Sequence, residues 1–365
     1  MANLILATVP NGFWEKIIFA FNGAVKNYAF AIILITICIK LVLLPLDYLN
    51  KRSTIKMNEL NAKIQPKIAE IQKRYPDKNI QNQKINELYQ KEKINPLGSC
   101  LPMLAGFVLQ LVVFITLFSG LNSMSAYKIT NQYEKLQVAY ITEYAQKVDS
   151  LTSEEIEELT SVEIDNYIIK ISTKLETESE EEYQERLTKA QSSANKKYKD
   201  VKDSFLWIKN VWIADSAFKK SIPSFESYLG TSKIKLKDDE KENAKIAYNY
   251  VMGSLSSSSK GVNGYFILAL LAAASTYFSQ YLATRKQKKK ENFYTQNQKP
   301  TEQQKAQEGS AKVMMVVLPV IMAIFALSNN SIFSLYIVTS QLVSMVTTPL
   351  VNKLVSLSDK KKETK

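Results

Sequence analysis

The stretch that decides the fold is YAFAIILITICIKLVLLPL, residues 28–46. It is close to the roughly 20 residues that a helix needs to cross a bilayer, yet Lys40 lies well inside it. The nearest polar position is Asp47, which at about 1.5 Å per residue is roughly 10 Å away and beyond comfortable reach of a lysine. A charge there costs on the order of 3 kcal/mol unless it faces water or a polar partner. We therefore predict a hydrated, positively charged cavity within the membrane.

Four more apolar runs follow the first, and each is close to the length of a membrane span. They occupy residues 100–122, 262–283, 313–328 and 332–352, with polar, charged segments between them. The mean hydropathy of −0.14 hides this alternation. The sequence is typical of a polytopic membrane protein with a sizeable soluble insertion.

The composition also excludes several kinds of chemistry. The chain has no histidine, which removes histidine-based triads and the commonest general base and metal ligand. Its two cysteines, Cys38 and Cys100, show neither zinc-site nor disulfide spacing, and we expect both to be buried packing residues. No Walker-type loop is present. We expect no enzyme activity, no cofactor and no metal.

Charge predicts the orientation, because Lys and Arg accumulate on the cytoplasmic side. Residues 50–98 carry 11 Lys and Arg against 5 Asp and Glu, residues 284–312 carry 8 against 3, and residues 353–365 carry 5 against 2. The segment 123–260 is net negative instead. These differences predict a plasma-membrane protein with its N-terminus outside and its C-terminus inside.

The predicted fold is an all-α polytopic membrane protein with five transmembrane helices, a cytoplasmic helical hairpin and a mostly helical extracytoplasmic insertion. The expected segments are an outer interfacial helix (1–25), five spans (26–49, 99–122, 261–284, 312–328 and 332–352), a cytoplasmic basic helical hairpin (50–98), an extracytoplasmic insertion (123–260), a cytoplasmic basic loop (285–311) and a cytoplasmic basic tail (353–365).

Polar residues recur at helical spacing within these spans, and residues three or four apart share a helix face. If the stripes converge on Lys40, they line a hydrated groove; otherwise the hydroxyl groups bond to their own helices or join helices together. The predicted groove residues are Lys40, Thr36, Gln110, Thr276, Ser279, Gln280, Tyr336, Ser340 and Gln341.

The hairpin at 50–98 shows an apolar stripe through Ile64 and Ile68, a turn at Tyr75-Pro76-Asp77, and Pro66, which should kink or restart its first helix. The basic segments favour contact with anionic headgroups or ribosomal RNA. We expect Lys67, Lys73 and Arg74 to recruit substrate. The predicted ribosome or headgroup contacts are Arg285, Lys288, Lys289, Lys290, Lys360, Lys361 and Lys362.

Several motifs, in this order, resemble those of the YidC family of membrane-protein insertases. They include residues 31–46, IQPKIAEIQKRY at 64–75, NPLGSCLPM at 95–103, FLW at 205–207 and MMVVLP at 314–319. The layout resembles the five-helix, Gram-positive type. A family arginine corresponds to Lys40, which keeps the charge but not the planar, five-donor fork.

The resemblance implies an insertase and chaperone that moves nascent transmembrane segments from the cytoplasm into the bilayer through a groove open to lipid and cytoplasm. Its expected partners are nascent membrane proteins, the ribosome, the lipid bilayer and the Sec translocon, with no small-molecule substrate. The alternative is an anion transporter or channel that uses Lys40 as its binding site, although the paired broken helices typical of transporters are not evident. A membrane enzyme and a structural scaffold are further alternatives.

Overall fold

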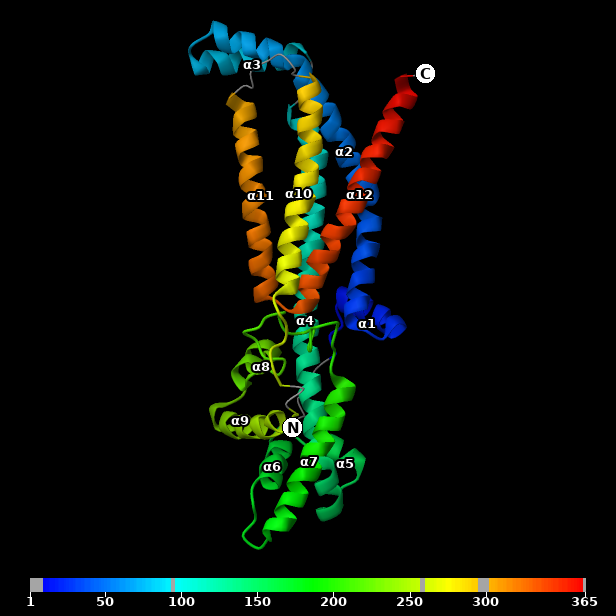
Figure 1. Cartoon of the computed structure of the whole chain (residues 1–365), viewed down its shortest axis with the longest axis vertical. Coiled ribbons are helices and arrows are strands. Elements are labelled where there is room, and N and C mark those ends of the chain that lie inside the picture. The colour runs from blue at the N-terminus through cyan, green and yellow to red at the C-terminus, as the bar shows by residue number, and fades with distance from the viewer. Residues whose placement is uncertain (1–8, 93–95, 257–259, 295–301, 364–365) are drawn as a thin grey trace. The chain divides into compact units, whose positions relative to one another are not determined.

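The computed structural model describes residues 9–92, 96–256, 260–294 and 302–363. Within these ranges the side chains at 57–59, 61–62, 96–104, 107, 283–294, 302–308, 310–311 and 359–363 lie outside the description. The protein is an all-α polytopic membrane protein, as predicted. The helices, labelled in Figure 1, are α1 (Phe13–Val25), α2 (Tyr28–Arg74), α3 (Lys78–Lys91), α4 (Pro96–Val148), α5 (Ser153–Glu158), α6 (Ser161–Ser172), α7 (Glu180–Val201), α8 (Phe225–Ser232), α9 (Asp238–Gly253), α10 (Ile267–Tyr294), α11 (Glu302–Ser328) and α12 (Ser331–Glu363).

The chain divides into two compact units, and several long helices contribute a part to each. The first unit comprises Met1–Ile32, Phe118–Ala269 and Phe325–Leu335, and the second comprises Ile33–Leu117, Leu270–Ile324 and Tyr336–Lys365. The first unit thus contains the whole predicted insertion, and the second contains all the predicted groove residues.

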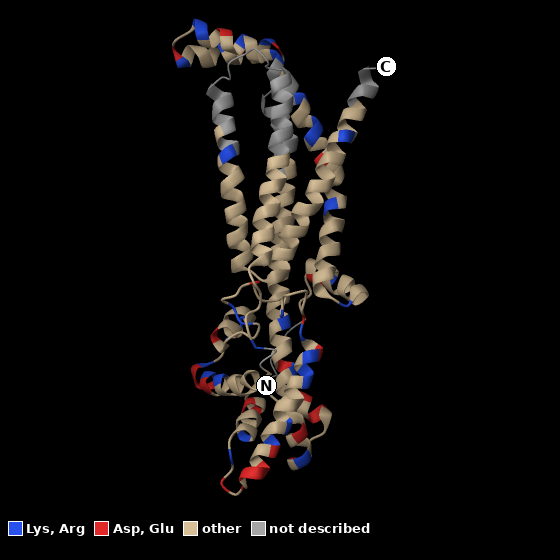
Figure 2. Cartoon of the chain, in the orientation of Figure 1, with Lys and Arg blue, Asp and Glu red and all other residues tan. Residues whose placement is uncertain are grey.

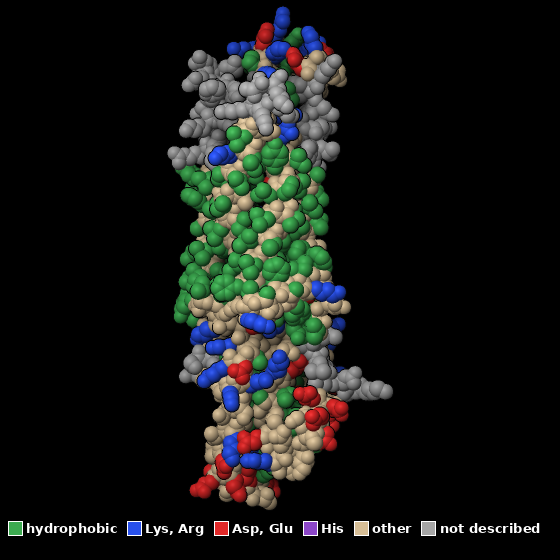
Figure 3. Space-filling view, turned by 90° about the vertical axis from the view of Figure 1, so that its right-hand side faces the viewer, with side chains coloured by type: hydrophobic (Ala, Val, Ile, Leu, Met, Phe, Trp, Pro, Cys, Tyr) green, Lys and Arg blue, Asp and Glu red, His purple; other side chains and the backbone are tan. Residues whose placement is uncertain are grey.

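The second unit carries the apolar surface of the protein. Val42 is 77% exposed and Val346 is 72% exposed, and similar side chains cover α10 and α11. In Figure 3 hydrophobic side chains form a broad band on the face shown, and in Figure 2 the long helices carry few charges over their middle part. Among the described residues, three helical segments are long and apolar enough to span a bilayer: Tyr28–Lys56, Val108–Val148 and Ser331–Ser358. Ile267–Leu282 and Lys312–Ser328 are shorter apolar helices. A surface this apolar is suited to lipid rather than water.

The hairpin forms with the predicted turn, and its first helix does not restart at Pro66. Helix α2 continues through both Pro45 and Pro66 to Arg74, and α3 begins after the turn, where the Asp77 side chain accepts a hydrogen bond from the backbone N–H of Asn79. Ile64 and Ile68 are buried, and hydrophobic residues of both helices pack on them: Leu60, Ile85, Leu88 and Tyr89. The apolar stripe therefore marks the contact between the two helices.

Several helices run further than the apolar runs that identified them. Helix α4 continues from Pro96 to Val148, so the predicted second span and the first helix of the insertion are one element. Helix α10 reaches Tyr294 and α11 begins at Glu302, which places helix within the predicted loop at 285–311. Helix α12 likewise continues through most of the predicted tail. Cys38 is exposed on α2, contrary to expectation, and the side chain of Cys100 lies outside the described residues.

The insertion in the first unit is mostly helical, and its helices begin with strong local signals. In α5, α6 and α7 the N-cap hydroxyl accepts a backbone N–H while the glutamate three residues later accepts the N-cap N–H. These reciprocal capping pairs are Thr152 with Glu155, Thr160 with Glu163, and Ser179 with Glu182.

The segment 208–216 is the irregular centre of the first unit, and Asn263 satisfies much of its backbone. The Asn263 Nδ2 group donates to the carbonyl oxygens of Asn210 (2.9 Å), Ile213 (3.0 Å) and Ala214 (3.0 Å). The Asn263 Oδ1 atom accepts from the Asn210 N–H (2.8 Å). Trp212 is buried here, with its indole N–H donating to Asp203.

The same segment fixes the beginnings of two helices of the first unit. The Asp215 carboxylate accepts the backbone N–H groups of Tyr265 (2.8 Å) and Leu268 (2.6 Å) at the start of α10. The Ile213 carbonyl accepts both the N–H and the hydroxyl of Ser331 at the start of α12. One loop therefore positions two helices that are far apart in the sequence.

Replacing Asn263 with alanine should destabilise the protein by about 2–4 kcal/mol. The change leaves the Ala214 carbonyl and the Asn210 N–H without these partners in a buried site, at about 1–3 kcal/mol for each buried group. Thermal unfolding of the purified full chain in detergent measures the effect. Asn249→Ala, at an exposed position of α9, is the matched control and should change the melting temperature little.

Asp165→Asn should stabilise the protein at pH 8 and have little effect near pH 4. Burial raises the pKa of Asp165 from 3.8 to about 7, although the hydrogen bond from Gln137 opposes the rise. The folded state therefore favours the protonated acid, and this contribution to stability is lost as the pH rises through about 7. The full difference between the two pKa values corresponds to a change of roughly 4 kcal/mol at most in the free energy of unfolding. Melting temperatures of the variant and the wild type across this pH range, with exposed Asp200→Asn as control, test the prediction.

Candidate functional site

Lys40 is buried within the apolar part of α2. Its side chain is only 9% exposed, and Thr36, one turn earlier on the same helix, is 1% exposed. Asp47, half-buried two turns later, acts electrostatically on the ammonium group. Among the described residues no carboxylate oxygen lies within 4.0 Å of Lys40 Nζ, so the charge has no direct ion pair there. The predicted central residue is therefore a buried cation that is compensated only at a distance.

The predicted polar positions on the other helices differ in their surroundings. Thr276 on α10 is 1% exposed, and its hydroxyl has no hydrogen-bond partner among the described residues. Tyr336 on α12 is also buried, and its ring lies 6.3 Å from the ring of Phe114 on α4. Gln110, one turn before Phe114, is exposed. The remaining predicted groove residues, Ser279, Gln280, Ser340 and Gln341, are half-buried.

The contact between the Phe114 and Tyr336 rings brings α4 and α12 together. The contacts described above do not connect every predicted row of polar residues to Lys40. Convergence of the polar faces on the lysine remains a prediction. Two other hydroxyl groups on these helices bond to the backbone of their own helix instead. Ser275 donates to the Ala272 carbonyl (3.3 Å), and Ser344 donates to the Ser340 carbonyl (2.8 Å). Such bonds within one helix are the usual way to satisfy a hydroxyl in a membrane span.

A close approach between α2 and α4 was missed by the sequence reasoning. Gly106 on α4 is buried against the Asn50 side chain of α2, and a Cβ atom at this position would overlap the Asn50 amide. A glycine within a membrane-spanning run is the signal that could have identified this contact, because small residues let helices approach closely.

The basic residues predicted on the hairpin have two kinds of surroundings. Lys67 pairs with Glu92, so it links the first helix of the hairpin to the C-terminal end of α3. Lys73 and Arg74 are exposed in the last turn of α2, next to the turn. Only the latter two present uncommitted positive charge among the residues predicted here to recruit substrate.

The other predicted basic contacts fall where no side chain is described. Arg285, Lys288, Lys289 and Lys290 belong to the last part of α10, and Lys360, Lys361 and Lys362 belong to the end of α12; all seven side chains lie outside the described residues. Among the described residues no group of three metal-ligating side chains is gathered in one place.

A family model matches this chain over most of its length, whereas individual proteins match shorter stretches. The family model described as 60Kd inner membrane protein matches residues 20–360. Proteins named membrane protein insertase YidC match shorter stretches: 42% identity over 104 residues in Shewanella halifaxensis, 44% over 107 in Magnetococcus marinus and 46% over 98 in Thioalkalivibrio sulfidiphilus. These stretches cover 27–29% of this chain and 16–18% of the relatives, so the chain matches less than a fifth of their length. Because the family model covers nearly the whole sequence, the chain belongs to the 60Kd inner membrane protein family.

Proposed function

We propose that this protein is a membrane-protein insertase, which moves transmembrane segments of nascent proteins from the cytoplasm into the bilayer. The observation that carries the proposal is the family match over residues 20–360, together with relatives named as insertases. The buried cation in α2 supports it, because a lysine inside an apolar span is costly and is kept where it has a function.

The proposed mechanism uses charge and hydration rather than covalent chemistry or a cofactor. Lys40 attracts a polar or acidic segment of the arriving chain into a hydrated groove, which shortens the apolar barrier that the segment must cross. Thr36, Thr276 and Tyr336, all buried polar residues of the second unit, are the groove lining that we favour most. Burial of the arriving helix in lipid, at roughly 25 cal/mol per Å², supplies most of the driving force.

The other parts of the chain have proposed roles outside the membrane. In the orientation set by the basic segments, the N-terminus and the insertion are outside, whereas the hairpin and the C-terminus are inside. Lys73 and Arg74, exposed at the tip of the hairpin, recruit substrate. The basic ends of α10 and α12 contact the ribosome, and the Sec translocon is a further proposed partner. The anion-channel alternative has no specific observation in its favour.

Loss or reversal of the charge at residue 40 should impair the insertion of substrates with acidic outer segments. Lys40→Glu and Lys40→Ala remove the attraction, whereas Lys40→Arg retains the charge and should be tolerated. Insertion into proteoliposomes of a substrate with an acidic outer segment, and of a matched substrate with a neutral one, measures the effect. Equal insertion by all three variants would contradict the electrostatic role, and anion conductance by the same liposomes would favour the channel.

Residue 40 should also be reachable from water. In a Cys38→Ser, Cys100→Ser background, which has no other thiol, a Lys40→Cys variant should react with a charged, membrane-impermeant thiol reagent added from the cytoplasmic side. The matched control is Val42→Cys, at an exposed apolar position of the same helix, which should face lipid and react slowly. Equally slow reaction at both positions would mean that Lys40 lies in dry packing and that no hydrated groove surrounds it.

A further inference from the structure

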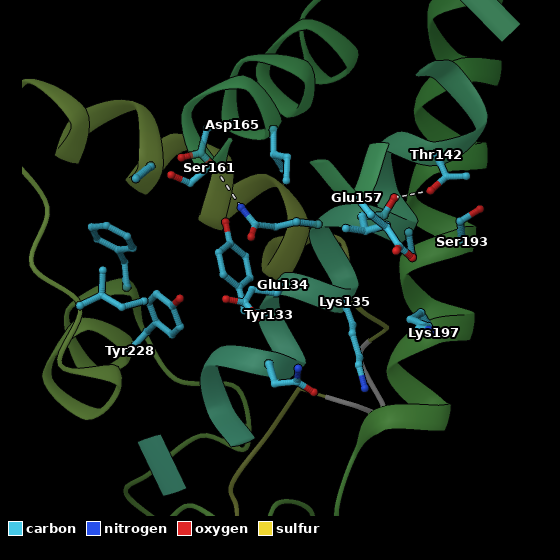
Figure 4. Close-up of a pocket in the computed structure, with 18 of the residues that line it drawn as sticks. Tyr133, Glu134, Lys135, Thr142, Glu157, Ser161, Asp165, Ser193, Lys197 and Tyr228 are labelled. Atoms are coloured by element: carbon cyan, nitrogen blue, oxygen red, sulfur yellow. Dashed lines mark hydrogen bonds between the residues drawn. The ribbon is translucent and has the colours of Figure 1, made fainter. Parts of the chain in front are cut away.

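A cavity of about 770 Å³ lies within the first unit, in the part of the chain that forms the insertion at 123–260. Its walls come from α4, α5, α6, α7, α8 and α9, and Figure 4 shows the residues that line it. The volume falls within the range of roughly 300–1,000 Å³ that is typical of small-molecule sites. Nothing in the proposed insertase mechanism uses this cavity.

One part of the wall is aromatic. Tyr133, Phe225 and Tyr228 line the cavity, and the rings of Tyr133 and Tyr228 meet edge to face with their centroids 5.2 Å apart. Tyr248 packs behind them, 4.8 Å from Tyr133 and 5.0 Å from Tyr228, and holds both rings in place. Leu229, Ile234 and Leu236 complete an apolar surface. Such a surface suits the apolar body of a ligand, and aromatic faces attract cations.

The charge beside this aromatic surface is negative once Asp165 is ionised, above its pKa of about 7. Asp165 lines the cavity, is 9% exposed and accepts a 3.0 Å hydrogen bond from the Gln137 side chain. Among the described residues no lysine or arginine forms an ion pair with it, and the neighbouring Glu134 adds a second carboxylate. In Figure 4 Asp165, Tyr133 and Tyr228 lie in one half of the view, whereas Lys135 and Lys197 lie in the other.

We propose that this cavity binds an organic monocation, an amine or guanidinium group on an apolar body, with the cation beside Asp165 and the body against Tyr133 and Tyr228. The carboxylate supplies a charge-assisted hydrogen bond and the rings supply cation–π attraction. The group comes from a free small amine or from the basic side chain of a peptide.

Two other kinds of ligand fit this half of the cavity less well. An anion would be repelled by the ionised carboxylate of Asp165, and Glu134 also lines the cavity. A divalent metal ion needs several oxygen ligands, and among the described residues no group of three metal-ligating side chains is gathered in one place. A buried carboxylate with a raised pKa is also more typical of a functional site than of a structural one, because it weakens the fold that holds it.

Calorimetric titration of the purified full chain in detergent tests the proposal with three related probes. Tryptamine carries the cation, tryptophol replaces it with a hydroxyl group, and indole-3-propionate replaces it with an anion. Tryptamine should bind about tenfold or more tightly than either of the others. Comparable binding of all three would show that the cavity recognises only the apolar body, and would overturn the proposal.

Matched variants separate the site from general effects on folding. Asp165→Asn should weaken tryptamine binding about tenfold or more, whereas Asp200→Asn, which removes one carboxylate at an exposed position of α7, should leave it unchanged. Tyr228→Leu, which keeps the apolar character but removes the ring, should also weaken binding. Loss of binding in Asp165→Asn cannot be assigned to unfolding if its melting temperature at pH 8 equals or exceeds that of the wild type.

A second arm identifies the source of the cation. The N-acetylated, C-amidated tripeptide Gly-Lys-Gly is compared with the same tripeptide carrying norleucine in place of lysine. Preference for the lysine peptide over tryptamine assigns the site to basic peptide segments, and the reverse assigns it to free amines. Failure of both tryptamine and the lysine peptide to bind the wild type at about millimolar concentration would overturn the proposal, as would equal binding by Asp165→Asn. Neither measurement involves membrane insertion, so the result is independent of the proposed insertase function.

Discussion

Much of the first unit depends on the hydrogen bonds between Asn263 and the backbone of segment 208–216. A buried loop without regular structure has backbone groups that cost free energy unless each finds a partner. One amide side chain supplies several of these partners, and Asp215 and Ile213 extend the same network to the first turns of α10 and α12. Helices separated by tens of residues in sequence are thereby held to a common loop, and the geometry of the unit follows from that.

The second unit is governed by a different constraint, the cost of a cation in an apolar surrounding. Lys40 and Thr36 are buried, and Asp47 compensates the charge from two turns away along α2. Among the described residues the ammonium has no direct ion pair. In the proposed mechanism this leaves it available to a negative group of an arriving segment, which has to cross an apolar layer.

The sequence predicted features that depend on local periodicity and missed those that depend on tertiary contacts. The apolar runs identified the spanning helices, and the stripe through Ile64 and Ile68 identified the hairpin, because both patterns repeat within one or two turns. Helix ends were less predictable: α4 and α10 continue past the apolar runs, since polar residues also form helix. Burial of Trp212 and the cavity beside Asp165 were not predictable, because each requires helices from separate parts of the chain to meet.

The reciprocal caps of α5, α6 and α7 have a consequence for biogenesis. Each pairs a hydroxyl and a glutamate only three residues apart, so each helix start is encoded without any distant contact. In the proposed orientation these residues cross the membrane during synthesis and form their structure on its far side. Signals this local fix where each helix begins before the remainder of the polypeptide has been made, and later packing then stabilises helices that are too short to persist alone.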